Sequence, residues 1–136
     1  MTAGYSRRSL SEKLGIAPGT KVVALGAPPD YGALIAPLPE GSTVQTRLRP
    51  GARFIHQFAR SRAELETAFP RLAAALADDG TLWISWPKKA SGVETDLTEN
   101  VLRELGLPLG LVDVKVCAVD EVWSGLKFVR RKENRR

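Results

Sequence analysis

The spacing of apolar residues predicts strands alternating with helices along most of the chain. Short apolar runs closed by Gly or Pro indicate buried strands at Lys21 to Leu25 and in the segment "GTLWISWP", which starts at Gly80. Between them, segment 61–77 predicts a helix that Pro70 should kink or split. Its apolar stripe repeats at three and four residues and consists of Leu65, Phe69, Leu72 and Leu76.

Shorter patterns predict the remaining elements. Ser9 and Glu12 form a capping-box pattern for a short helix that Gly15 should end. Another helix is expected to end at Gly106, with Thr95 or Asp96 as its N-terminal cap. Glu99 is placed to complete a capping box there. A turn or two of helix should precede Pro37, and further strands are predicted at 43–48, 53–59, 111–119 and 126–130.

This order of elements predicts an α/β fold. Strands that alternate with helices favour right-handed crossovers and a mostly parallel sheet. The short connection between the last two strands instead indicates an antiparallel C-terminal hairpin. Trp83 and Trp86 lie three apart in one strand and should therefore face opposite sides of a central strand. We predict a three-layer Rossmann-like sheet.

The length and charge of the chain limit the number of domains and the classes of partner. The 136 residues fit one domain, expected at 1–129, followed by a basic, disordered tail at 130–136. That tail carries four of the five net positive charges, so the body is close to neutral. A neutral body argues against nucleic-acid binding, which needs basic residues over a folded face.

Other function classes find no support in the sequence. Cys117 is the only cysteine, which excludes an intrachain disulfide and favours the cytoplasm. No run is long enough for a signal peptide or a membrane span. With one His and one Cys, no zinc constellation exists, so we expect no metal, and we also expect no cofactor.

Several strings in the chain resemble one family of small bacterial proteins, frequent in actinobacteria. They are "SLSEKLGIAPG", "FIHQF", "SWPKKASG", "TDLTE" and "VDVKVCAVDEVWSGLKFV", and they span nearly the whole chain. The family they resemble is the domain of unknown function numbered three thousand and fifty-two. That resemblance implies no known activity.

The order of elements also resembles a truncated class I methyltransferase fold. In that family the first strand leads into a Gly-rich turn, and an acidic residue after the second strand holds the cofactor ribose. This chain has Ala27, Pro28, Pro29 and Asp30 after its first strand, and Gln45 to Leu48 around the second. The sequence therefore predicts an altered or lost S-adenosylmethionine site.

The segment "WPKKASGVETDLTEN" is the main candidate site. It leaves the carboxyl end of a strand, where open α/β sheets bind ligands, and enters a helix N-terminus. Lysine charge, a hydroxyl and flexible backbone would suit an anion, although acidic residues in the same segment could satisfy the helix start instead. The candidate ligand-binding residues are Lys88, Lys89, Ser91, Gly92, Thr95 and, from the first turn, Asp30.

The predicted function is that of a non-catalytic α/β module, rather than an enzyme, that binds a small anion or a protein partner. The alternative is an enzyme on the methyltransferase-like scaffold, with Asp30, His56, Lys88 and Asp120 as its candidates. Within this picture His56 should be partly buried and hydrogen-bonded, and Cys117 should be a buried strand residue. A homodimer that covers an exposed edge strand is a further expectation.

Overall fold

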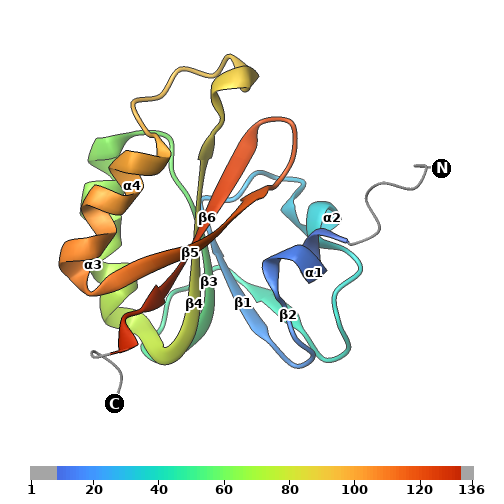
Figure 1. Cartoon of the computed structure of the whole chain (residues 1–136). Coiled ribbons are helices and arrows are strands. Elements are labelled where there is room, and N and C mark those ends of the chain that lie inside the picture. The colour runs from blue at the N-terminus through green and yellow to red at the C-terminus, as the bar shows by residue number, and fades with distance from the viewer. Residues whose placement is uncertain (1–8, 133–136) are drawn as a thin grey trace.

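A computed structural model describes residues 9–132, and the first eight and last four residues lie outside it. The chain forms one six-stranded sheet in the order β2-β1-β3-β4-β6-β5 (Figure 1). Its strands are β1 (Lys21–Leu25), β2 (Thr43–Gln45), β3 (Ala52–Phe58), β4 (Leu76–Pro87), β5 (Leu111–Ala118) and β6 (Trp123–Arg130).

The pairing directions confirm the predicted sheet. β2, β1, β3 and β4 run parallel to one another, whereas β6 is antiparallel to both β4 and β5. Parallel neighbours need crossover connections, which the chain supplies through its helices. The result is a mostly parallel sheet with an antiparallel C-terminal hairpin.

Helices cover both faces of the sheet and complete three layers (Figure 1). They are α1 (Leu10–Leu14), α2 (Tyr31–Ile35), α3 (Arg62–Ala75) and α4 (Glu99–Gly106), with 3-10 turns η1 (Lys89–Ser91) and η2 (Leu107–Leu109). α3 and α4 pack over one core, and α1 and α2 over the other. Trp86 belongs to the first core and Trp83 to the second, as their spacing predicted.

Helix ends test the capping predictions. Ser9 and Glu12 form the predicted capping box of α1, and Gly15 ends that helix with φ 80°. The cap predicted for α4 is wrong, because Thr98 caps it by accepting from the Val101 N–H at 3.2 Å. Thr95 and Asp96 instead form hydrogen bonds at the start of α3.

Pro70 neither ends nor splits α3, which runs through it unbroken. A proline removes one helical hydrogen bond, but packing can hold both halves of a helix in place. Phe69 and Leu72 flank Pro70 and are almost wholly buried against the sheet. Tertiary packing therefore overrides the local signal.

The bounds of several strands differ from the predicted ones. β2 has three residues and ends at Gln45, so segment 46–48 is not strand. β4 is longer than predicted, since it begins at Leu76. Arg130 closes β6, and residues 133–136 of the expected tail lie outside the described residues.

Candidate functional site

The candidate residues follow the carboxyl ends of three strands. Lys88 comes directly after β4, Asp30 lies five residues beyond β1, and Arg60 follows β3. Because these strands are parallel, their ends meet at one edge of the sheet. Segment 88–98 rises beyond that edge and then descends to α4 (Figure 1).

The first half of this segment forms a tight turn. The Lys88 N–H donates to the Val122 carbonyl at 2.7 Å, which ties the turn to the β5–β6 connection. The Ser91 hydroxyl donates to the Lys88 carbonyl and accepts from the Val93 N–H. Gly92 closes the turn at φ 78°, where a side chain would be strained. Ser91 and Gly92 thus shape the backbone that carries Lys88 and Lys89.

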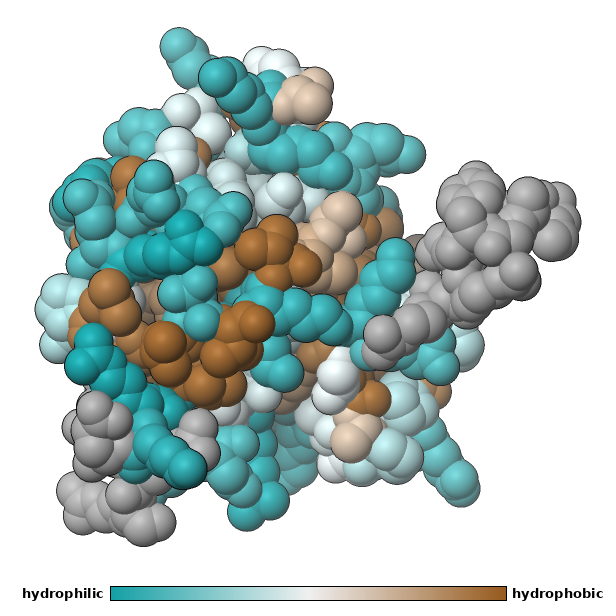
Figure 2. All heavy atoms as spheres, viewed as in Figure 1, coloured by the Kyte–Doolittle hydropathy of each residue, from teal (hydrophilic) through white to brown (hydrophobic). Residues whose placement is uncertain are grey.

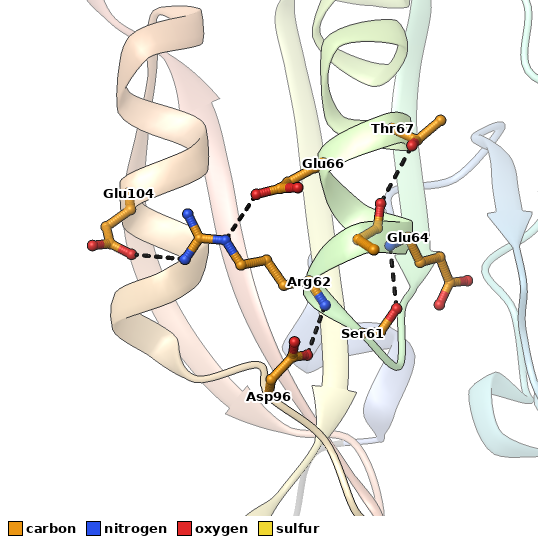
Figure 3. Close-up of polar contacts among 8 residues, drawn as sticks. Ser61, Arg62, Glu64, Glu66, Thr67, Asp96 and Glu104 are labelled. Carbon is orange, nitrogen blue, oxygen red and sulfur yellow. Dashed lines mark hydrogen bonds and ion pairs between the residues drawn. The ribbon is translucent and has the colours of Figure 1, made fainter.

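The second half of the segment docks onto the start of α3. The Thr95 hydroxyl donates to the Arg60 carbonyl at 2.7 Å, and an Asp96 carboxylate oxygen accepts from the Arg62 N–H at 2.7 Å (Figure 3). Asp96 therefore places negative charge at the positive end of α3. Ser61 also caps α3 by accepting from the Glu64 N–H.

Arg62 then links α3 to α4. Its guanidinium is paired with Glu66 on α3 at 2.8 Å and with Glu104 on α4 at 3.3 Å (Figure 3). All three side chains are substantially exposed, so each ion pair contributes little to stability by itself. The pair with Glu104 joins the C-terminal half of α4 to the first turn of α3.

The turn after β1 is packed against β3. Gly26 has φ 66°, and a Cβ built on it would lie 2.9 Å from the Phe58 carbonyl oxygen. The Gln57 amide donates to that same carbonyl at 2.8 Å and to the Leu25 carbonyl at 3.4 Å. A side chain at position 26 would therefore clash with the backbone of β3.

Arg60 and Trp123 form a contact at the same edge that the sequence did not indicate. The Arg60 guanidinium carbon lies 4.9 Å from the centre of the Trp123 ring. A cation over an indole face is attracted by the ring electrons. Arg60 follows a strand end, but nothing in the sequence indicated that Trp123 would lie beneath it.

His56 is buried and hydrogen-bonded, as predicted, and more deeply than expected. Its exposed fraction is 0%, its Nδ1 lies 2.8 Å from the Tyr31 hydroxyl, and its Nε2 lies 2.7 Å from the Ser85 hydroxyl. Burial lowers the pKa of His56 to about 3 and raises the pKa of Tyr31 above its ordinary value. The ring is neutral at pH 7 and has no access to a ligand.

Of the other acidic candidates of the enzyme alternative, Asp120 has a structural role and Asp30 forms no side-chain capping bond. An Asp120 carboxylate oxygen accepts from the N–H groups of Val122 and Trp123, both at 2.8 Å, and so shapes the β5–β6 turn. Asp30 is exposed at the start of α2 and makes no side-chain capping bond. Cys117 is buried in β5, as predicted.

Neither a metal-ligand cluster nor a membrane-spanning helix is present within residues 9–132. No three His, Cys, Asp or Glu side chains in this range gather in a group that could hold a metal ion. No helix in the same range has the length and apolar character that crossing a membrane requires.

Comparison with known proteins shows the fold alone. No family model matches the chain, and no curated protein matches it in sequence. The resemblance to the numbered domain of unknown function therefore stays a prediction.

Solved structures are similar to the chain across most of its length. A TehB-like S-adenosylmethionine-dependent methyltransferase from Corynebacterium glutamicum has a TM-score of 0.54 at 15% identity, covering 95% of this chain and 91% of that one. Magnesium protoporphyrin IX methyltransferase from Synechocystis, with bound cofactor, has 0.58 at 15%, covering 89% and 74%. A protein described as a possible exported protein from Bordetella parapertussis has 0.60 at 12%, covering 90% and 66%. The chain has a methyltransferase-like fold.

The residues do not fit S-adenosylmethionine in the manner that this fold implies. That cofactor needs backbone of the first turn free to approach it, and an acidic residue after the second strand. Here Gly26 and Ala27 are followed by two prolines without N–H groups, and β2 ends at Gln45 with Thr46 and Arg47 next.

Proposed function

We propose that this chain has a methyltransferase-like fold that no longer binds S-adenosylmethionine. Instead, the edge of the sheet formed by the carboxyl ends of its parallel strands, here called the carboxyl edge, binds a small anion. Its membership of the numbered bacterial family and its place in the cytoplasm are part of the proposal. They rest on the quoted strings and on the single cysteine.

The structure of the turn after β1 supports the loss of S-adenosylmethionine binding. The side of Gly26 that a Cβ would occupy faces the Phe58 carbonyl oxygen at 2.9 Å. Asp30 is the one acidic residue of this turn, and it lies at the start of α2 rather than at the end of β2. The proposal assigns no catalytic residue, because the only histidine has an exposed fraction of 0%.

The charges of the edge support an anionic ligand. Lys88 and Lys89 follow β4, and Arg60 follows β3 beside Thr95. Within residues 9–132 neither lysine makes an ion pair with a protein carboxylate. An anion bound there would supply the missing negative charge.

Calorimetry and thermal shift test the two halves of the proposal separately. We expect no micromolar binding of S-adenosylmethionine, and stabilisation by sulfate or phosphate that the double variant Lys88→Ala, Lys89→Ala reduces. Arg71→Ala, at an exposed position on α3, is the matched control. Micromolar binding of S-adenosylmethionine would contradict the loss of the cofactor site, and stabilisation that the lysine variant does not reduce would remove the anion site.

A second candidate function is self-association through β5. This strand is at the edge of the sheet, and its Val114 and Val116 are 54% and 51% exposed. Figure 2 shows apolar residues gathered on the face where β5 crosses the molecule. An exposed apolar edge strand is a template for pairing with a second copy.

A further inference from the structure

A hollow of about 880 Å³ opens at the end of the sheet opposite to the lysine turn. Lys21 and Ala52, the first residues of β1 and β3, lie at its base. The segment before β1 and segment 45–53 form its walls. Since β1 and β3 are parallel, the hollow lies at the amino edge and is separate from the site proposed above.

The hollow exists because no helix joins β2 to β3. The chain leaves β2 at Gln45 and reaches β3 at Ala52 through an irregular segment. Leu48 from this segment and Val23 from β1 belong to the core on the α3 side. An open concavity therefore remains beside β1, walled by loop rather than by helix.

The lining of the hollow is basic. Lys21, Arg47, Arg49 and Arg53 all line it, and no acidic residue among residues 9–132 does. In the part of the chain that the structure describes, the first three make no ion pair, and Arg53 lies 3.9 Å from an exposed Asp79. Four cations gathered in one concavity of a nearly neutral body repel one another unless an anion joins them.

Size and chemistry together define the ligand class. The volume lies within the roughly 300–1,000 Å³ usual for small-molecule sites. One guanidinium group can donate two parallel hydrogen bonds to the oxygens of a phosphate group. Three arginines therefore exceed what a single phosphate group needs. Apolar wall residues could contact an organic portion: Ala17, Pro18, Val23, Pro50 and Ala52.

We propose that this hollow binds a small organic ligand carrying two or more phosphate groups, such as a nucleoside diphosphate. A nucleic-acid backbone is a poorer match, because it needs cations spread over a broad face rather than gathered in one concavity. The hollow is separate from the carboxyl-edge site, since the two share no residue.

Calorimetry of the full chain with ADP, pyrophosphate and inorganic phosphate tests this proposal. We expect ADP and pyrophosphate to bind at least about tenfold more tightly than phosphate, because they engage several charge-assisted bonds. The double variant Arg47→Ala, Arg49→Ala should weaken ADP binding by at least about tenfold, since each lost bond to a charged group has that effect. Both positions are exposed, so the fold should survive.

Two control variants separate this site from general electrostatic attraction. Arg71→Ala removes one exposed positive charge outside the hollow, and Arg71→Ala with Lys132→Ala removes two. Both should leave ADP binding unchanged. Equal losses in all variants, no binding of ADP or pyrophosphate, or tighter binding of a DNA duplex than of ADP would each overturn the proposal.

Discussion

The carboxylate of Asp96 accepts a 2.7 Å hydrogen bond from the backbone N–H of Arg62, 34 residues earlier in the chain. A residue from the loop before α4 thus caps the start of α3. Thr95 strengthens the attachment through the Arg60 carbonyl. The loop is therefore fixed at its second half, while its lysine turn is held by local bonds and by Val122.

Removing the Asp96 cap should destabilise the fold. We expect Asp96→Ala to lower the free energy of unfolding by ~1 kcal/mol, the usual cost of losing a cap. Asp96→Asn should cost less, because its amide oxygen can still accept the hydrogen bond. Denaturant melts measure both. Glu94→Ala makes the same charge change at an exposed neighbouring position, and an equal loss there would contradict the capping role.

His56 should make stability fall as the solution is acidified. Its folded pKa of about 3 lies below its ordinary 6.5, so below pH 6.5 the unfolded chain takes up a proton that the folded chain does not. We expect this group to lower the free energy of unfolding by about 2 kcal/mol between pH 7 and pH 5. Denaturant melts of His56→Gln should show a correspondingly flatter dependence over that range.

An NMR titration checks the same point without a variant. His56 is the only histidine, so the imidazole signals belong to one residue. They should not titrate between pH 7 and pH 5 while the protein remains folded. A midpoint near 6.5 would contradict the buried, neutral ring.

Gly26 should tolerate a side chain less well than Gly92. Both have positive φ, 66° and 78°, but an added Cβ would meet the Phe58 carbonyl oxygen only at Gly26. We expect Gly92→Ala to cost about 1 kcal/mol from backbone strain alone. Gly26→Ala should cost about 1–3 kcal/mol more, because a backbone atom must move. Thermal melts compare them, and equal costs would contradict the close packing of the first turn.

If β5 mediates self-association, charge on its exposed side should abolish it. Val114 and Val116 are each about half exposed, so replacing both with Lys should leave the core intact. Light scattering should then show a dimer for the unaltered chain and a monomer for the variant. A chain that is monomeric at high concentration removes this candidate function.

The sequence predicted most of the scaffold because burial leaves a periodic pattern. The two-sided apolar run of β4 and the stripe of α3 required no knowledge of their partners. The predicted cap of α4 was wrong because a capping bond depends on which segments lie side by side in the fold. Thr95 and Asp96 satisfy a local cap pattern equally well, and only the fold shows that α3 lies beside them.

The candidate sites were less predictable because they depend on contacts between distant segments. Lys88 could be placed at a strand end, but the network of His56 with Tyr31 and Ser85 joins three separate elements. The sequence pattern predicts a strand over 46–48 and gives no sign that Arg47 belongs to a loop that forms the wall of a hollow. Composition also concealed the hollow, since the body averages to near neutrality.

The shortness of β2 has a consequence for local stability. Its three residues pair only with β1, and Thr43 and Val44 are exposed, so opening this edge breaks few contacts. Amide hydrogens in β2 should therefore exchange with solvent before those of β4, which is paired on both sides. A ligand that binds segment 45–53 would favour the closed edge by mass action. It would slow exchange in β2 selectively, and the least stable strand would then report occupancy of the basic hollow.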